Sequence, residues 1–415
     1  MPRQEYIYTF ILGRNTALSV AEIFSVLTRE RFVFVILSIS ANALIIKTTK
    51  EIKNAQWFLD CLGGTIKIAE ILEKTNGEKD IKEIILNFII NNKQKTKFVW
   101  GISSYDLDNM GVNRLNRFGF EIKNSLKKEK VSSRFIQLKN VSFLSAPEII
   151  NNKVLGKGKE IILIKTENGV LIGETIAIQN FQSYSFRDYE RPKRNPKSGM
   201  LPPKLAQIMI NFAPSCNCIY DPFCGNGTIL AEAMLMGRKV LGSDLLPRAV
   251  SDTKENIYWL KDKYNFETTI NPEKDIFQSD ATNITERHLP YKPECIVSEI
   301  YLGPPLARPP HKEELYKTTS KIEKMLLSFL KNTFDNLAYV EHLILAIPFY
   351  KIKGADYKLN IIDQIEYIGY NILSPFESIK INQKIIPEHN HTRKTVLYSR
   401  EGQIVGREII ILRRR

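Results

Sequence analysis

Long apolar runs are absent from this 415-residue chain, and no segment reaches the roughly 18–20 consecutive apolar residues that a membrane-spanning helix needs. The composition is otherwise globular, with 43% hydrophobic residues and no low-complexity tract. The amino terminus, MPRQEYIYTF, lacks the pattern of a signal peptide. We therefore expect a cytoplasmic protein that has no membrane segment.

Cysteine and histidine, the usual metal ligands, are scarce. The five cysteines are scattered and odd in number, which favours a reducing compartment over a disulfide framework. Cys216 and Cys218 form C-x-C rather than C-x-x-C and have no histidine nearby, while His389 and His391 have no third ligand at a useful spacing. We expect no metal site.

The length suggests two or three domains, because one hydrophobic core rarely serves so long a chain. The net charge of +14 is unevenly placed: residues 1–200 hold 31 Lys and Arg against 20 Asp and Glu, and residues 201–415 hold 28 against 25. A generally basic composition would spread this excess evenly. Its concentration predicts a polyanion-binding module in the first half of the chain.

The stretch Cys218–Met236, CIYDPFCGNGTILAEAMLM, predicts a strand, a tight turn and a helix. A short apolar run ends at Asp221, and the glycines of the turn are Gly225 and Gly227. This unit binds nucleotide-like ligands at the carboxyl end of a parallel strand. The third glycine of the dinucleotide fingerprint is missing, and an acid before the turn suits a positively charged ligand better than a pyrophosphate.

Two further acids follow in order. Val240–Asp244 reads as a second strand that ends in an acid 23 residues after Asp221, a spacing that suits a carboxylate bonded to ribose hydroxyls. Asp280 is the third. Any one of these acids is unremarkable on a solvated loop, but three in register with three strand ends favour a cofactor site.

The first stretch resembles motif I of the Rossmann-type methyltransferases, D-P-x-C-G-x-G-T. The resemblance implies S-adenosylmethionine as the cofactor and an α/β, Rossmann-like class I methyltransferase domain. It also implies that Asp221 and the glycine turn face the methionine half, that Asp244 meets the ribose, and that Asp280 and Ala281 meet the adenine. The cofactor-binding residues predicted in this way are Asp221, Pro222, Cys224, Gly225, Gly227, Asp244, Leu245, Asp280 and Ala281.

The first half of the chain predicts two α+β modules, over residues 1–65 and 66–180, before a linker at 181–203 and the methyltransferase domain at 204–415. Within the second module, the window Arg114–Lys139 carries eight basic and two acidic side chains but few aromatics. Such a window favours recognition of phosphates and shape over base stacking. The residues predicted to bind RNA here are Lys123, Lys127, Lys128 and Arg134.

This domain order resembles the THUMP-domain RNA methyltransferases, in which the THUMP module grips the acceptor end of tRNA. Phe186–Pro192 and Gly199–Ala206 resemble the segment that precedes the catalytic domain in the tRNA guanine-N2 methyltransferases, and Leu62–Lys67 and Gln403–Ile409 extend the likeness over nearly the whole chain. The resemblance implies methylation of a guanosine in tRNA, with position ten favoured. The prolines of the linker predict a stiff joint, and its Arg187 and Arg191 are predicted to contact RNA.

Amino-methyltransferases carry the motif [D/N/S]-P-P-[Y/F/W] after the fourth strand. Residues 298–305 read Ser-Glu-Ile-Tyr-Leu-Gly-Pro-Pro, so one register places Glu299 at the acid, and the other, Gly303–Leu306, keeps the prolines but loses the acceptor and the ring. We prefer the first, in which Glu299 orients the amine and Tyr301 lies beside the base. Glutamate is one methylene longer than aspartate, about 1–1.5 Å, and such a misplacement can cost ~100-fold in rate unless the loop compensates.

Two alternatives remain open on sequence alone. A tRNA-binding scaffold or partner protein that retains the fold without catalysis is favoured by the altered motif at Glu299, and a DNA amino-methyltransferase would use the same motif but leaves the basic first half unexplained. The modified nucleotide, mono- against dimethylation, self-association and the need for an activator subunit also stay open. Later in the chain we expect a fifth strand at Leu343–Pro348 and a closing hairpin of Thr395–Ser399 with Glu408–Leu412.

Overall fold

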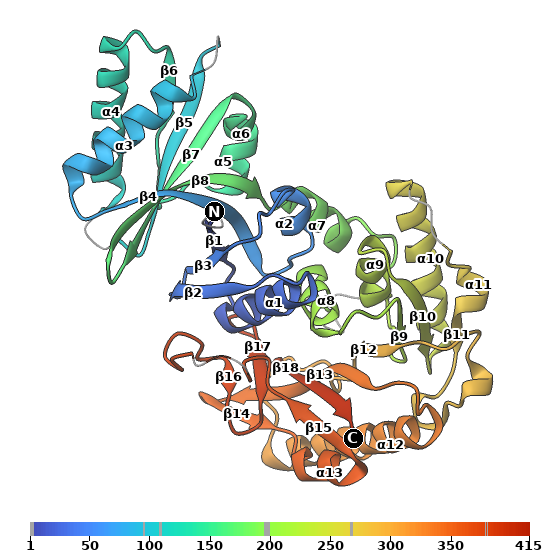
Figure 1. Cartoon of the computed structure of the whole chain (residues 1–415). Coiled ribbons are helices and arrows are strands. Elements are labelled where there is room, and N and C mark those ends of the chain that lie inside the picture. Colours follow the sequence, from blue (N-terminus) through green and yellow to red (C-terminus); the bar gives the residue numbers. More distant parts are fainter. Residues whose placement is uncertain are drawn as a thin grey trace. The chain divides into compact units, whose positions relative to one another are not determined.

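The computed structural model describes residues 4–93, 96–107, 110–194, 200–265, 269–377, 379 and 381–415. The chain forms two compact units (Figure 1). Unit 1 comprises residues 1–16, 30–61 and 65–181, and unit 2 comprises residues 17–29, 62–64 and 182–415.

Unit 1 is built on one eight-stranded sheet with the order β2-β3-β1-β4-β8-β7-β5-β6. Its pairs are antiparallel except at one edge, where β5 runs parallel to both β6 and β7. Strands β7 and β8, which follow each other directly in the chain, form an antiparallel pair. The strands are β1 (Tyr6–Leu12), β2 (Phe34–Ile39), β3 (Ala43–Thr48), β4 (Thr65–Thr75), β5 (Phe98–Tyr105), β6 (Ser133–Ile136), β7 (Gly158–Thr166) and β8 (Gly169–Ile178).

Strand β4 joins the two halves of this sheet. It pairs antiparallel with β1 on one side and with β8 on the other. The sequence predicts separate modules over 1–65 and 66–180, whereas the structure gives them one sheet. The expected boundary falls at Thr65, the first residue of the strand that both halves share.

Helices α3 and α4 lie beside each other against β5 and β6 (Figure 1) and share their apolar core. In α4 the buried residues Leu115, Phe118, Ile122 and Leu126 recur at helical spacing, so its polar residues lie on the opposite face. The helices of unit 1 are α2 (Ala55–Asp60), α3 (Glu78–Asn91), α4 (Val112–Lys128), α5 (Ala146–Asn151) and α6 (Val154–Lys157).

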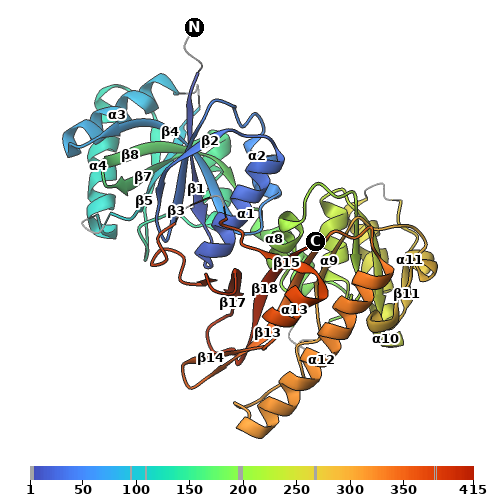
Figure 2. The same cartoon turned by 60° about the horizontal axis from the view of Figure 1, so that its bottom comes forward.

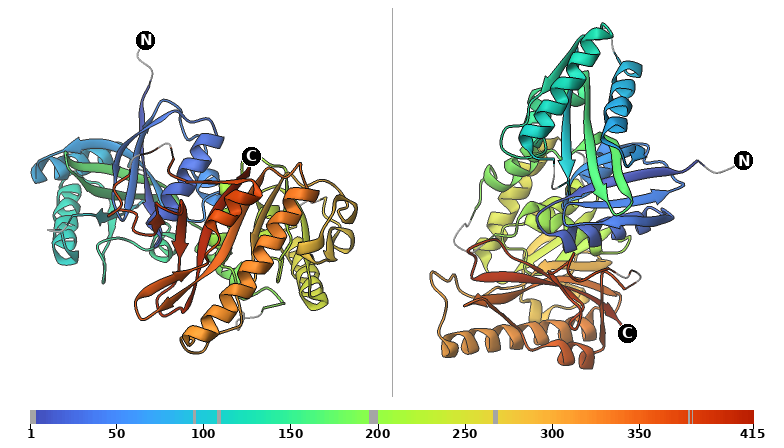
Figure 3. Two further views of the ribbon diagram at one scale, coloured as in Figure 1. Left: turned by 90° about the horizontal axis from the view of Figure 1, so that it is seen from below. Right: turned by 90° about the vertical axis from the view of Figure 1, so that its left-hand side faces the viewer.

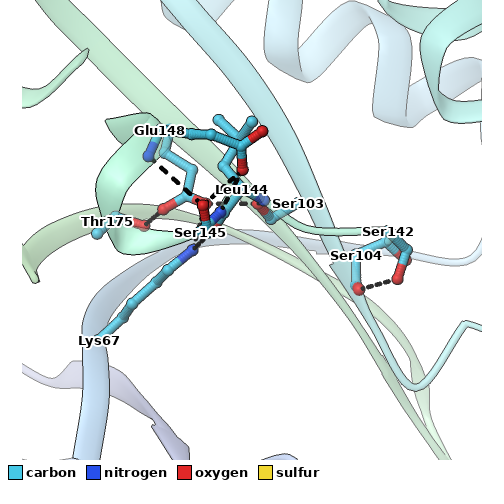
Figure 4. Close-up of polar contacts among 9 residues, drawn as sticks. Lys67, Ser103, Ser104, Ser142, Leu144, Ser145, Glu148 and Thr175 are labelled. Carbon is cyan, nitrogen blue, oxygen red and sulfur yellow. Dashed lines mark hydrogen bonds and ion pairs between the residues drawn. The ribbon is translucent and has the colours of Figure 1, made fainter. Parts of the chain in front are cut away.

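A buried ion pair ties several strands of unit 1 together (Figure 4). Lys67 of β4 donates to Glu160 Oε1 of β7 at 2.6 Å and to the Leu144 carbonyl at 2.7 Å. Ser103 of β5 and Thr175 of β8 also donate to the Glu160 carboxylate. Because each buried charge has polar partners, the cost of removing both from water is offset.

Unit 2 is built on a second sheet with the order β11-β10-β9-β12-β13-β18-β17-β16. Strands β11, β10, β9, β12 and β13 are parallel, and β18 is antiparallel to β13. The strands are β9 (Cys218–Asp221), β10 (Lys239–Asp244), β11 (Ile276–Gln278), β12 (Cys295–Glu299), β13 (His342–Ile352), β14 (Ala355–Lys358), β15 (Tyr370–Leu373), β16 (His389–Asn390), β17 (Thr395–Tyr398) and β18 (Val405–Arg414).

Helices cover both faces of this sheet, as expected for a Rossmann-like fold. Helices α8, α9 and α10 lie on one face and α12 and α13 on the other (Figures 1 and 3), and Figure 2 shows α12 and α13 side by side. The bounds are α7 (Phe181–Tyr189), α8 (Pro203–Phe212), α9 (Thr228–Leu235), α10 (Pro247–Tyr264), α11 (Pro272–Asp275), α12 (Lys312–Asn336) and α13 (Ile362–Ile368), with short 3₁₀ turns at Ala281–Asn283 and Glu286–His288.

The predicted fifth strand is confirmed as β13, and the predicted closing hairpin as the antiparallel pair β17 and β18. The linker expected at 181–203 contains α7, and its residues 195–199, with Pro196 and Gly199, lie outside the described residues. The structure also joins Cys216 and Cys295 in a disulfide, a pairing that the scattered cysteines did not predict.

Helix α1 (Thr16–Arg29) groups with unit 2 from Ala17 onward. Its Glu22 is fully buried and accepts the backbone N–H groups of Gly63 and Gly64, both at 2.8 Å, and the Asn211 side-chain amide at 2.7 Å. Burial raises the pKa of Glu22 to about 7, although these hydrogen bonds oppose the rise. A carboxylate with three donors thus fixes this amino-terminal helix within unit 2.

Candidate functional site

The glycine turn after β9 takes a backbone conformation that favours glycine. Gly225 and Gly227 have φ angles of 52° and 77°. A Cβ on Gly227 would lie 2.8 Å from Thr253 Cγ2, whereas a Cβ on Gly225 would meet only the Phe223 carbonyl, at 3.9 Å. The turn therefore packs closely against α10 at Gly227 and stays open at Gly225, where a ligand can approach the backbone.

Asp244, at the end of β10, braces this turn. Its carboxylate accepts the Gly225 N–H at 3.0 Å through Oδ2 and the Leu246 N–H at 3.0 Å through Oδ1. A carboxylate has about four lone-pair positions, so each oxygen keeps the capacity for a further donor. The parallel strands bring the ends of β9 and β10 to one edge of the sheet, as the sequence predicts.

Asp221, at the end of β9, is buried. It accepts the Ser298 hydroxyl at 2.5 Å and the Phe223 N–H at 3.1 Å. Burial raises the pKa of Asp221 to about 7; the two hydrogen bonds oppose the rise, while the carboxylates of Asp244 and Glu299 add to it. A cation placed near these three acids would reverse this effect and favour the ionised form.

A cavity of about 740 Å³ opens over these strand ends, within the size range of small-molecule and cofactor sites. It contains eight of the nine predicted cofactor residues, and Gly227, which packs against Thr253, is the exception. Asp280 caps the 3₁₀ turn by accepting from Thr282 through Oδ1. The predicted residues that line the cavity are Asp221, Pro222, Cys224, Gly225, Asp244, Leu245, Asp280 and Ala281.

Glu299 and Tyr301 line the same cavity. Ile300 between them is buried and donates its N–H to the Ala346 carbonyl at 3.1 Å, so the intervening residue anchors the loop to the sheet. The Tyr301 side chain is 56% exposed. Burial raises the pKa of Glu299, and the Arg407 guanidinium, which donates to Glu299 Oε1 at 2.6 Å, opposes that rise.

Several cavity residues were not among the predicted site residues. Thr228, the first residue of α9, ends the motif D-P-x-C-G-x-G-T and could have been found from it. Met200 and Leu201 lie in a segment noted for its resemblance but without an assigned role. Arg248, in the first turn of α10, and Met325, on α12, carry no recognisable pattern in the sequence.

The two linker arginines are placed differently from expectation. The Arg187 side chain is only 10% exposed and forms a two-bond ion pair with the buried carboxylate of Glu232, at 2.6 and 3.0 Å. Arg191 is 6% exposed, and its Nη1 donates to Thr228 Oγ1 at 2.6 Å. These contacts hold both guanidinium groups inside unit 2, so we correct their assignment from RNA contact to internal roles.

The basic residues predicted to bind RNA in unit 1, by contrast, lie at the protein surface. Lys127 and Lys128 end α4 on its exposed side, and Arg134 is exposed on β6, where it donates to Asn152 Oδ1 at 3.1 Å. Lys123 lies 5.8 Å from the centre of the Phe120 ring and is partly exposed. The four predicted RNA-binding side chains of this unit thus reach solvent, as phosphate contact requires.

In the part of the chain that the structure describes, no group of three or more His, Cys, Asp or Glu residues could hold a metal ion. No helix over the described residues is long and apolar enough to cross a bilayer.

Comparison with known proteins gives a consistent result. Residues 191–329 match the model of the RMKL-like methyltransferase domain. A tRNA (guanine(10)-N2)-dimethyltransferase of Methanothermobacter thermautotrophicus is 34% identical over 40% of this chain and 43% of its own length. Another, of Pyrococcus abyssi, is 30% identical over 52% of this chain and 68% of its own length. The match therefore spans less than half of the first relative and about two thirds of the second.

Among solved structures, TrmN from Thermus thermophilus has a TM-score of 0.52 and 12% sequence identity, and the superposition covers 99% of this chain and 100% of that one. At this identity the likeness shows the fold alone. It extends over both units.

Proposed function

The chain belongs to the tRNA guanine-N2 methyltransferase family, and on that premise we propose that it methylates the exocyclic N2 amine of a guanosine in tRNA, with S-adenosylmethionine as the methyl donor. The single observation that carries the proposal is the cavity in unit 2, where the glycine turn, Asp244, Asp280 and Glu299 meet. Position ten is the favoured target because the relatives are named for it.

The residues of the cavity fit such a cofactor. The open turn at Gly225 would accept the methionine half, and Asp221, once ionised, would face its positive charge. Asp244 keeps lone pairs for ribose hydroxyls beside its two backbone bonds, and Asp280 keeps one carboxylate oxygen for the adenine amine, with Leu245 and Ala281 as apolar walls. Arg191 adds a buried positive charge behind Thr228, which lines the cavity. This charge would attract the carboxylate of the methionine half to that side of the cavity.

When bound, the cofactor would supply an electrophilic methyl group on a sulfonium, whose sulfur leaves as a neutral thioether when the methyl–sulfur bond breaks. The protein's task is to place the amine, whose lone pair is delocalised into the guanine ring, in line with that methyl group. Glu299 would accept a hydrogen bond from the amine and then take the proton that nitrogen loses once the N–C bond has formed. The exposed ring of Tyr301 would stack on the base.

We further propose that unit 1 is a THUMP-like RNA-binding module and that Lys123, Lys127, Lys128 and Arg134 contact tRNA phosphates. Support comes from the basic excess in residues 1–200 and from the exposure of these side chains. The RNA would then be held mainly by its backbone, with affinity that falls steeply as salt rises.

The proposal is tested by incubating unmodified tRNA with the protein and methyl-labelled cofactor, and identifying the labelled nucleoside by mass spectrometry. N2-methylated guanosine is expected with the wild type and is expected to fall at least ~100-fold with Glu299→Ala. Cofactor binding without any transfer to tRNA would instead support the scaffold alternative.

A further inference from the structure

The contact between Glu299 and Arg407 connects the cavity with strand β18, two strands away in the same sheet. Arg407 Nε lies 2.6 Å from Glu299 Oε1, and the two side chains are 3% and 18% exposed. Arg407 is on β18 and lies 108 residues away in sequence. A charge-assisted bond of this length between largely buried groups fixes the orientation of the carboxylate.

The register of the sheet explains how the two side chains meet. Strand β13 lies between β12 and β18, with Glu299 opposite Ala346 and Arg407 opposite Pro348. Ala346 and Pro348 are two residues apart and therefore share one face of β13 with Glu299 and Arg407. Since both intervening side chains are small, the arginine can reach across β13.

The distance between β12 and β18 explains why residue 299 is a glutamate rather than an aspartate. Two strand spacings amount to about 10 Å, which a long arginine and a glutamate bridge together. An aspartate at residue 299 would be shorter by about 1.5 Å and would leave the guanidinium without this contact. Residue 299 differs from the amino-methyltransferase motif by one methylene group. That extra length therefore lets its carboxylate reach Arg407.

The second oxygen of the Glu299 carboxylate is available to a substrate. Arg407 Nε is bonded to Oε1, and Oε2 accepts no hydrogen bond from any residue that the structure describes. Because Glu299 also lines the cavity, the arginine holds one oxygen while the other remains for the amine.

We propose that Arg407 is a positioning residue for methyl transfer: by holding Glu299 Oε1, it directs Oε2 at the amine and keeps the carboxylate ionised as an acceptor. This inference rests on the proposed function. The arginine does not touch the substrate, and its effect reaches the amine only through Glu299.

The charge of the Arg407 guanidinium also supports its role as a positioning residue. Burial raises the pKa of Glu299, and Arg407 is the neighbour that opposes the rise. Asp221 of β9 is a further titratable group that interacts with Glu299, and its own pKa is raised to about 7, in part by the carboxylates of Asp244 and Glu299. Removing the guanidinium would let Glu299 protonate at higher pH, and a protonated carboxyl group is a poorer acceptor.

The test is steady-state methyl transfer to tRNA with Arg407→Gln, and Arg413→Gln as the matched control. Arg413 is on the same strand but is exposed and lies outside the cavity. For R407Q we expect kcat to fall ~100-fold with cofactor affinity unchanged, and for R413Q no change. Arg407→Lys, which keeps the charge but not the Nε geometry, is expected to fall between wild type and R407Q.

Two readouts separate positioning from a general loss of structure. R407Q should move the acid limb of the pH profile of kcat to higher pH, because Glu299 loses the guanidinium that opposes its protonation, whereas R413Q should leave that limb in place. Glu299→Asp combined with R407Q should be no worse than Glu299→Asp alone, because the shorter side chain has already lost the contact.

Additive losses in this double variant, or an unmoved acid limb, would overturn the inference, as would full activity of R407Q. If R407Q does not fold, R407K with normal cofactor binding serves in the same comparison, and a kcat equal to wild type overturns the inference. A wild type that transfers no methyl group to tRNA would refute the proposed function instead.

Discussion

The Ser298 hydroxyl donates to the Asp221 carboxylate at 2.5 Å, which links the end of β12 to the end of β9 beneath the cavity. Ser298 directly precedes Glu299, so the strand that carries the proposed amine acceptor also supports the acid that faces the proposed cofactor. Burial leaves this acid with a pKa of about 7, in the range where cells operate.

Cofactor affinity is expected to depend on pH through Asp221. Below pH 7 the buried carboxyl group is largely protonated, and it must lose its proton to face a cation. Affinity for S-adenosylmethionine should therefore rise about tenfold between pH 6 and 8, as measured by calorimetry. Asp221→Asn should bind more weakly and without this dependence, while the exposed-site control Asp262→Asn should match wild type. A flat wild-type profile would contradict the assignment.

Gly227→Ala should abolish cofactor binding or weaken it strongly. Its new Cβ would lie 2.8 Å from Thr253 Cγ2 in a backbone conformation with φ of 77°. Gly237→Ala is the matched control, because Gly237 has a φ of 75° but no atom within 4 Å of the added Cβ. The control should lose only about 1–2 kcal/mol of stability from backbone strain.

The cause of the Gly227 effect can be separated further. Thr253→Ser removes the Cγ2 atom that the new Cβ would meet, so it should restore part of the binding lost in Gly227→Ala. Equal behaviour of Gly227→Ala and Gly237→Ala in calorimetry would show that the close packing of the turn is unimportant.

Arg187 is expected to matter for stability rather than for RNA affinity. Arg187→Ala would leave the buried Glu232 carboxylate unpaired, which should cost about 3–5 kcal/mol in chemical denaturation. The surface ion pair of Lys193 and Glu255 provides the comparison, and Lys193→Ala should cost less than about 1 kcal/mol. A stable Arg187→Ala protein with weakened tRNA binding would restore the original sequence prediction.

Neutralising Lys127, Lys128 and Arg134 together should weaken tRNA binding and reduce its salt dependence. Each lost phosphate contact lowers the slope of log affinity against log salt by about 0.7–0.9. Filter binding at several salt concentrations measures both quantities. Replacing the exposed Lys74 and Lys165 of the same unit removes charge without touching α4 or β6. An equal loss in that control would indicate a general effect of charge rather than a defined contact.

Local patterns in the sequence were sufficient to predict much of the site. Asp221 and Asp244 end their strands and Asp280 follows the next one, and parallel strands bring their carboxyl ends to one edge. The structure accordingly gathers all three around one cavity.

Features that depend on distant residues were not predictable in this way. Arg407 meets Glu299 only because β18 is inserted antiparallel beside β13, and no spacing in the sequence reveals that register. Helix α1 joins unit 2 through Glu22 and Asn211, which are 189 residues apart. For Arg187 and Arg191 the local pattern was misleading. Basic residues in a linker suggest contact with nucleic acid, but both side chains are buried and bind partners inside the protein.

The most direct test of the whole account compares two tRNAs that differ by one group. The first carries guanosine at position ten and the second carries inosine, which lacks only the exocyclic amine. With labelled S-adenosylmethionine, the protein should bind both tRNAs alike and methylate only the first. Methylation of the inosine-containing tRNA at the same rate would show that the N2 amine is not the acceptor and that Glu299 does not orient it.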